Sequence, residues 1–178
     1  MTSLPNESIR LLRDVDAYMV PSGDEVKLLA GNLVRVTQAL GGNFTILING
    51  NMVQITQENA DALGLESEEV TETLPTGGSL EQQIWDQLKT CYDPEIPVNI
   101  VELGLIYDLN VDKESKNVEI KMTLTAPGCG MGPVIADEVD RKVNAVEGIE
   151  SVKVELVWEP TWNRDMMSEV AQLELGML

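Results

Sequence analysis

Cys129 is one of only two cysteines in the chain, and it lies between two glycines in the stretch TAPGCGMGP. Gly128 and Gly130 permit positive φ angles and a close approach to the backbone, which a buried structural cysteine does not need. The stretch stands where a strand-like run changes into a helix-like one, and the first N–H groups of a helix favour an anion. We therefore predict an accessible Cys129 thiolate that acts as a nucleophile or a metal ligand. The alternative is a small residue that fills a turn.

Two carboxylates, Asp93 and Glu95, flank Pro94 in a segment that cannot be helical. Carboxylates bind iron more weakly than thiolates do, which suits a protein that must release the metal it holds. We predict that Asp93 and Glu95 join Cys129 as metal ligands, the alternative being an Asp-Pro turn with solvated carboxylates. The residues expected to complete the site around these ligands are Thr125, Gly128 and Gly130.

The second cysteine, Cys91, continues an apolar stripe at helical spacing with Ile84 and Leu88. Buried cysteines are common, so we expect Cys91 to pack in the core. Its position two residues before Asp93 leaves open that it joins the site.

Composition excludes several classes of protein. The chain has no histidine, which removes Ser-His-Asp triads, Cys-His dyads and histidine-based metal sites. No lysine follows a glycine, so there is no P-loop, and Pro133 stands where a dinucleotide-binding motif requires its third glycine. Acidic residues outnumber basic ones by 30 to 12, and the net charge of −18 repels nucleic acid and anionic membranes. With no long apolar stretch, no signal-peptide pattern and no disulfide framework, we expect a cytoplasmic protein.

The second half of the chain, residues 79–178, predicts an α+β domain with the order α-β-β-α-β-α and helices on one face of a small three-stranded sheet. Ser79 caps the first helix, and Asp93-Pro94 ends that segment. Strands are expected near 105–111, 118–125 and 151–158, a helix from Pro133 to Gly148, and a last helix capped by Asn163.

Strand direction brings the candidate residues together. The hairpin between the first two strands makes them antiparallel, and a helical crossover makes the third parallel to the second. The loops that carry Asp93, Cys129 and the segment 158–162 are then expected at one rim of the sheet.

The first half, residues 1–64, predicts a β-rich domain, with strand-like runs at 17–20, 25–29, 33–39, 44–48 and 52–56. Asn49-Gly50 is a strong hairpin signal, and we expect a small antiparallel barrel or meander. The acidic, Gly- and Pro-containing stretch 65–78 is predicted to be a linker.

The stretches DPEIPVNIVELGLIYDLNV, MTLTAPGCGMG and WEPTWNRDMMSEVAQLELGM together resemble the SufT-type iron–sulfur cluster assembly proteins. The same domain occurs in PaaD-like proteins and in a eukaryotic cytosolic iron–sulfur targeting factor. The resemblance implies a compact α+β domain that helps to build clusters or deliver them to client proteins. Its motif residues fall on Asp93, Pro94, Glu95, Thr125 and Cys129, with Cys129 as the reactive cysteine.

The resemblance implies a transiently bound iron–sulfur cluster as cofactor, with assembly proteins and client apo-proteins as partners, and a homodimer as one way to complete the ligands. Clusters normally take four thiolates, so one chain with two cysteines cannot supply them all. Three hypotheses remain open: an assembly factor in which Cys129 binds the cluster, an adaptor that never touches it, and a thiol enzyme. We rank the enzyme last, because without histidine its base must be a carboxylate or water.

Overall fold

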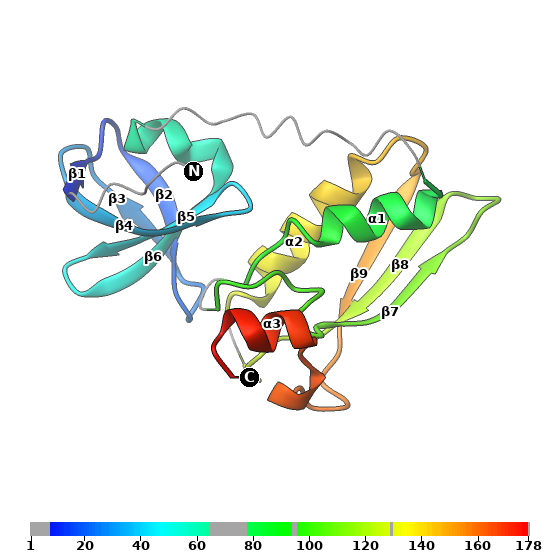
Figure 1. Cartoon of the computed structure of the whole chain (residues 1–178). Coiled ribbons are helices and arrows are strands. Elements are labelled where there is room, and N and C mark those ends of the chain that lie inside the picture. Colours follow the sequence, from blue (N-terminus) through cyan, green and yellow to red (C-terminus); the bar gives the residue numbers. More distant parts are fainter. Residues whose placement is uncertain (1–7, 65–77, 94–95, 129, 178) are drawn as a thin grey trace. The chain divides into compact units, whose positions relative to one another are not determined.

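The computed structural model describes residues 8–64, 78–93, 96–128 and 130–177 (Figure 1). Its contacts divide the chain into two compact units, Met1–Glu72 (unit 1) and Thr73–Leu178 (unit 2). The division falls inside the predicted linker, and residues 65–77 of that linker lie outside the described residues. The linker therefore stays a prediction, and each unit is described by itself. No helix in the described ranges has the length and apolar character that a bilayer crossing requires.

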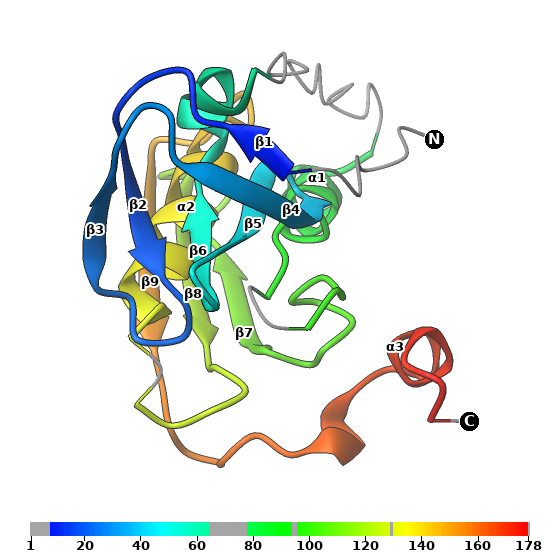
Figure 2. The same ribbon diagram turned by 90° about the vertical axis from the view of Figure 1, so that its left-hand side faces the viewer.

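The described part of unit 1 is a sheet of six antiparallel strands with a 3-10 helix, η1 (Gln57–Leu63). The strand order is β1-β4-β5-β6-β2-β3 (Figure 2). The strands are β1 (Ser8–Arg10), β2 (Val15–Met19), β3 (Glu25–Leu28), β4 (Leu33–Leu40), β5 (Asn43–Ile48) and β6 (Asn51–Ile55). Strands β4 to β6 form the expected meander, whereas the β2–β3 hairpin joins it at β6. The three-residue β1 was not expected, because so short a strand shows no period.

Exposed and buried side chains alternate along strands of unit 1, which explains how its sheet packs on the core. In β4, Val34 and Val36 are buried while Leu33 and Arg35 are exposed, so one face of the sheet meets the core. The predicted Asn49-Gly50 turn joins β5 to β6 with φ angles of 50° and 79°, the left-handed pair that a tight two-residue hairpin needs.

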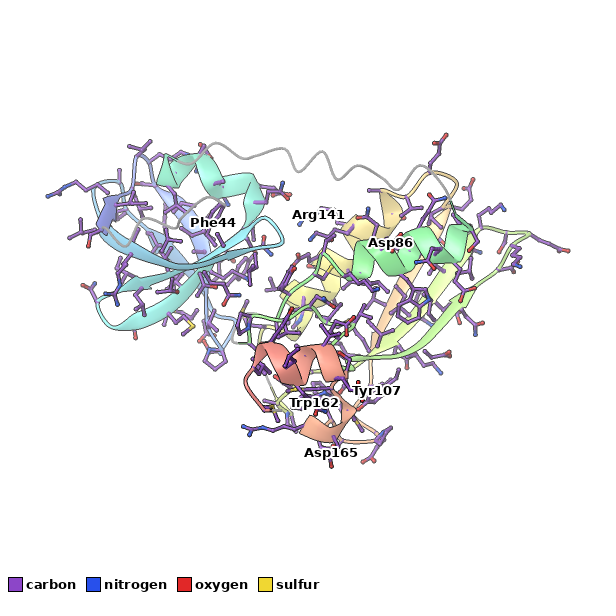
Figure 3. The ribbon with its side chains drawn as sticks, in the orientation of Figure 1. Phe44, Asp86, Tyr107, Arg141, Trp162 and Asp165 are labelled. Carbon is purple, nitrogen blue, oxygen red and sulfur yellow. The ribbon has the colours of Figure 1, made fainter. Side chains whose placement is uncertain are left out.

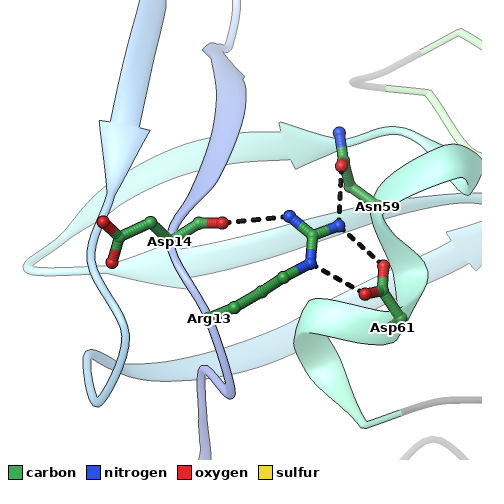
Figure 4. A network of polar contacts seen from close by, with 4 residues as sticks. All are labelled: Arg13, Asp14, Asn59 and Asp61. Carbon is green, nitrogen blue, oxygen red and sulfur yellow. Dashed lines mark hydrogen bonds and ion pairs between the residues drawn. The ribbon is translucent and has the colours of Figure 1, made fainter.

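An exposed polar network ties the start of unit 1 to η1 (Figure 4). The Arg13 guanidinium donates two hydrogen bonds of 2.7 Å to the carboxylate oxygens of Asp61, and a third of 2.9 Å to Asn59 Oδ1. It also donates to the backbone oxygen of Asp14. The hydrogen bond from Arg13 holds the pKa of Asp61 below its ordinary value.

Unit 2 contains a three-stranded sheet in the order β7-β8-β9, with helices before, between and after its strands. Its elements are α1 (Leu80–Leu88), β7 (Ile106–Val111), β8 (Asn117–Met122), α2 (Gly132–Asn144), β9 (Ser151–Leu156), η2 (Arg164–Met166) and α3 (Glu169–Glu174). Strand β8 is central, antiparallel to β7 and parallel to β9, as the hairpin and the crossover predict.

One face of the central strand β8 is buried and the other is exposed to solvent. Val118, Ile120 and Met122 of β8 are buried, and the residues between them are exposed. Helices α1 and α2 lie on the same side of the sheet in both ribbon views (Figures 1 and 2). As expected, Ser79 caps α1, because its hydroxyl accepts a hydrogen bond from the Gln82 N–H.

The expectation of one final helix capped by Asn163 is wrong. Asn163 caps only η2, and Ser168 caps a separate helix, α3. The interruption arises because the C-terminal segment docks on the loop that precedes β7 instead of running on as a helix. Trp162 Nε1 donates to Leu103 O at 2.7 Å, and the Ser168 N–H donates to Glu102 O at 2.8 Å.

Tyr107 of strand β7 also bonds to the C-terminal segment. Its hydroxyl donates to Pro160 O at 2.7 Å and lies 3.5 Å from Met166 Sδ, and both Tyr107 and Trp162 lie close to η2 (Figure 3). The register of β7 against β8 shifts at this residue, between Ile106 and Asp108. The irregularity aims Tyr107 at the C-terminal segment, as bulges re-aim side chains elsewhere.

At Gly104 the docked segment passes close to the backbone of the loop. Its φ is +76°, and a Cβ at this position would lie 2.2 Å from the backbone oxygen of Met166. Gly148, by contrast, has a φ of +94° and open space around its added Cβ.

We expect Gly104→Ala to destabilise unit 2 by about 1–3 kcal/mol more than Gly148→Ala, because both suffer backbone strain but only the first suffers a clash. Urea unfolding followed by tryptophan fluorescence measures this, since all three tryptophans (Trp85, Trp158 and Trp162) belong to unit 2. Equal losses in the two variants would show that the C-terminal segment does not dock as described.

We expect Asp61→Asn to reduce the loss of unit 1 stability in acid. Because Arg13 lowers the pKa of Asp61, the pair stabilises unit 1 fully above the ordinary aspartate pKa of about 4. That contribution is lost as the pH falls through the folded-state pKa. Urea midpoints at pH 7 and pH 3, read from amide NMR signals of β4–β6, should differ less in this variant than in the unmodified chain. The control Asp24→Asn, at another exposed aspartate of unit 1, should keep the full difference.

Candidate functional site

The predicted site residues fall into two groups. Asp93, Thr125, Gly128 and Gly130 belong to the described residues, whereas Cys129 and Glu95 lie outside them. The roles of Cys129 and Glu95 as metal ligands therefore stay predictions. The geometry below concerns the residues on either side of them.

Three loops meet at one end of the unit 2 sheet. The Thr123 N–H, just past β8, donates to Leu105 O, just before β7, at 2.8 Å. The Val157 N–H, just past β9, donates to Met122 O at 2.8 Å. The entrance of β7 and the exits of β8 and β9 therefore lie side by side, which is the rim expected from strand direction.

Asp93 reaches this rim with its carboxylate buried. The residue is 4% exposed, and its Oδ1 accepts the Ile96 N–H at 2.9 Å. Its Oδ2 lies 3.5 Å from Thr125 Oγ1, at the long end of hydrogen-bond geometry. The structure thus brings Asp93 to Thr125, four residues before Cys129. For Asp93, the alternative of a solvated turn carboxylate is wrong.

The segment around Asp93 is a short closed loop. Tyr92 forms an antiparallel bridge with Asn99, and the Asp93 N–H donates to Val98 O at 3.4 Å. The Ile100 N–H donates to Cys91 O at 2.9 Å, which ties the end of the loop to its beginning. Backbone bonds therefore join residues 91–93 to residues 98–100 at the two ends of this segment.

A buried ion pair missed by the sequence reasoning holds the chain just before Asp93. Lys142 and Glu138 of α2 are each 7% exposed, with 3.0 Å between Lys142 Nζ and Glu138 Oε1. Lys142 Nζ also donates to Thr90 O at 2.7 Å, just past the end of α1. The i,i+4 spacing of the pair was visible in the sequence, but such pairs are usually solvated, so nothing pointed to burial.

The glycines around Cys129 have different tasks. Gly128 has a φ of +76° and open space where a Cβ would be, so it makes the turn. Gly132 is the first residue of α2, and a Cβ there would lie 3.0 Å from Leu124 Cδ1 and 3.1 Å from Leu156 Cδ1. Gly132 therefore lets the start of α2 pack closely on the ends of β8 and β9. Gly132 is helical, so its lack of a side chain matters for packing and not for a positive φ.

The start of α2 has Pro133 in its first turn, as expected. The residue at its N-cap, Met131, supplies no side-chain hydrogen bond to the helix. The first N–H groups of α2, four residues or fewer after Cys129 in sequence, thus find no acceptor in the N-cap side chain.

Cys91 is core, as predicted. It is 0% exposed, and its thiol lies 3.9 Å from the backbone oxygen of Gln87. A fully buried thiol cannot reach a ligand at the rim. Among the described residues, no group of three or more His, Cys, Asp or Glu side chains is arranged to hold a metal ion.

The chain is similar to known proteins over about half of its length. A family model described as iron–sulfur cluster assembly protein matches residues 81–156. A protein of Porphyromonas gingivalis named Fe-S protein maturation auxiliary factor is 51% identical over 98 residues, which are 55% of this chain and 92% of that protein. The Fe-S protein maturation auxiliary factor YitW of Bacillus subtilis is 39% identical over 99 residues, 56% of this chain and 96% of that protein.

A solved structure agrees. The crystal structure of a domain of unknown function, DUF59, from Bacillus anthracis is 36% identical and superposes with a TM-score of 0.52, over 56% of this chain and 93% of that chain. Unit 1 lies outside the residues that the family model matches. On the strength of the match to nearly the whole length of these relatives, the chain belongs to the iron–sulfur cluster assembly protein family.

Proposed function

We propose that this protein is a maturation factor that helps to build iron–sulfur clusters or deliver them to client proteins, with the Cys129 thiolate as its contact to the cluster. Family membership supports the general role. The observation that carries the site is the buried Asp93 carboxylate against Thr125, at the base of the loop that contains Cys129. The cluster is cargo in this proposal.

The ligand count favours transient handling over storage. An iron–sulfur cluster usually takes four thiolates, and this chain has two cysteines, one of them sealed in the core. A cluster bound at Cys129 must therefore be shared with thiolates of an assembly protein, a client or a second copy. Sharing allows transfer, because each thiolate supplied by the client replaces one weaker contact of the carrier.

Asp93 has two roles in this scheme. Through the Ile96 N–H and Thr125 it fixes the position of its own loop against the chain that leads to Cys129. With Glu95 it also supplies oxygen ligands that bind iron weakly enough to let it go. The first role rests on contacts in the structure, and the second is tested below.

Two alternatives stand against this proposal, an adaptor and a thiol enzyme. An adaptor that joins assembly machinery to clients without binding the cluster fits the lack of a three-ligand group among residues 8–64, 78–93, 96–128 and 130–177. A thiol enzyme would need a base for Cys129, and the sequence contains no histidine to provide one. We propose a non-enzymatic carrier that works in the cytoplasm, where thiols stay reduced.

Cys129→Ser should abolish cluster uptake, whereas Cys91→Ser should retain it. The test is anaerobic reconstitution of the full chain with iron and sulfide, followed by visible absorbance and by transfer to an apo-ferredoxin. Cys129 should also react with a thiol reagent faster than Cys91, because Cys91 is exposed only when unit 2 opens. If neither the unmodified chain nor the variants take up a cluster while client binding persists, the adaptor is the correct reading.

Asp93→Asn and Asp93→Ala should separate the two roles of this carboxylate. The alanine variant leaves the Ile96 N–H without its acceptor and should lose about 1–3 kcal/mol in urea unfolding. The asparagine variant keeps an acceptor oxygen and should unfold nearly as the unmodified chain does. If the ligand role is correct, the folded asparagine variant still loses most of its cluster transfer. Full transfer by this variant would leave Asp93 with a structural role alone.

A further inference from the structure

Helix α3 has an apolar outer side as well as an apolar inner side. On the inner side, Met167 and Ala171 are 6% and 0% exposed. On the outer side, Val170 is 54% and Leu173 66% exposed, and Met177, just past the end of α3, is 45% exposed. These last three residues, called the α3 patch below, are spaced so that Val170 and Leu173 are neighbours on one helix face. Of the eight large apolar side chains exposed in the described ranges, these three lie within eight residues of one another, and clustered exposed apolar side chains mark interaction sites.

The beginning of α3 is fixed to the body of unit 2. The Ser168 hydroxyl accepts the Ala171 N–H at 3.2 Å and is also hydrogen-bonded to the Glu102 carboxylate. The Ser168 N–H donates to Glu102 O at 2.8 Å. The helix is therefore a firmly placed element, although in Figure 2 it lies off the sheet at the end of an extended segment.

The end of α3 is closed as a Schellman motif. Gly176 has a φ of +70°, its N–H donates to Leu173 O at 3.1 Å, and the Met177 N–H donates to Gln172 O at 2.8 Å. These bonds hold Met177 back against the helix. The α3 patch is thus presented on a fixed backbone, so a partner need not order it on binding.

The charges around the α3 patch are mostly acidic. Asp165, Glu169 and Glu174 are all exposed, residues 165–178 contain no lysine or arginine, and the exposed Arg164 of η2 is the basic residue next to them in sequence. Both units carry more acidic than basic residues. A second copy, unit 1 or an anionic membrane would each bring like charge to the acidic rim, so charge disfavours all three as occupants.

We propose that the α3 patch docks a basic amphipathic helix of a partner protein. Its leucine-type face covers Val170, Leu173 and Met177, and its lysines or arginines pair with Asp165, Glu169 and Glu174. A helix fits better than a strand, because the patch is a helix side whose backbone groups bond within α3, so only side chains are offered to a partner. The proposal goes beyond the proposed function, and its test contains no iron or sulfide.

The probe is a fluorescent synthetic helix with leucines along one face and lysines along both flanks, and its binding to the full chain is read by anisotropy. Val170→Ser with Leu173→Ser should weaken binding about tenfold or more, as truncation of anchoring residues does. The matched control is Leu12→Ser, which removes an equally exposed leucine, 68% against 66%, from unit 1 and should leave binding unchanged. A probe with glutamates in place of its lysines should not bind.

The photoreactive residue p-benzoylphenylalanine at position 173 locates the contact. Crosslinking to the lysine probe supports the proposal. Equal binding by the double variant and the control, or equal binding of the glutamate probe, overturns it. Crosslinking to a second copy or to unit 1 in competition with the probe overturns it as well, because the patch would then already be covered.

Discussion

Strand β8 pairs with β7 in the antiparallel direction and with β9 in the parallel direction, and these two directions decide which loops of unit 2 meet. Met122 at the end of β8 stands opposite Ile106 at the start of β7 and opposite Leu156 at the end of β9. Since parallel neighbours need a long crossover, α2 must lie between β8 and β9, and its beginning must lie at the same end. The chemistry proposed here is therefore a property of one sheet end, to which residues far apart in sequence contribute.

The strands and helices of unit 2 could be predicted because the spacing of their apolar residues indicates which side chains are buried. Val118, Ile120 and Met122 alternate with charged residues, and the Ser79 cap and Pro133 mark helix starts by their own backbone chemistry. The burial of Asp93 was not predictable, because an Asp-Pro dipeptide has the same local preferences whether or not the rest of the fold covers it. The final helix was misjudged for a related reason. Its interruption depends on Tyr107 and Trp162 bonding to backbone more than 50 residues away, which no local pattern records.

A buried carboxylate beside a cysteine-bearing loop suits a protein that holds its cargo briefly. The Asp93 carboxylate is largely shielded from water, and under the proposed function a chain with two cysteines would have to share a cluster with thiolates from elsewhere. The buried Lys142–Glu138 pair contributes from the other side by fixing Thr90 O. Removing either partner would leave an uncompensated charge in the interior, which costs far more than the pair itself contributes. The hydrogen bond from Lys142 Nζ to Thr90 O thus ties the end of α1 to α2.

The approach of Met166 O to Gly104 has a consequence for comparing sequences. A Cβ at this position would crowd that carbonyl, so the residue found there is informative about a homologue. A relative with glycine at this position keeps the space that the docked segment uses. A relative with any other residue has to shift the loop or the Met166 carbonyl to seat α3 in the same manner.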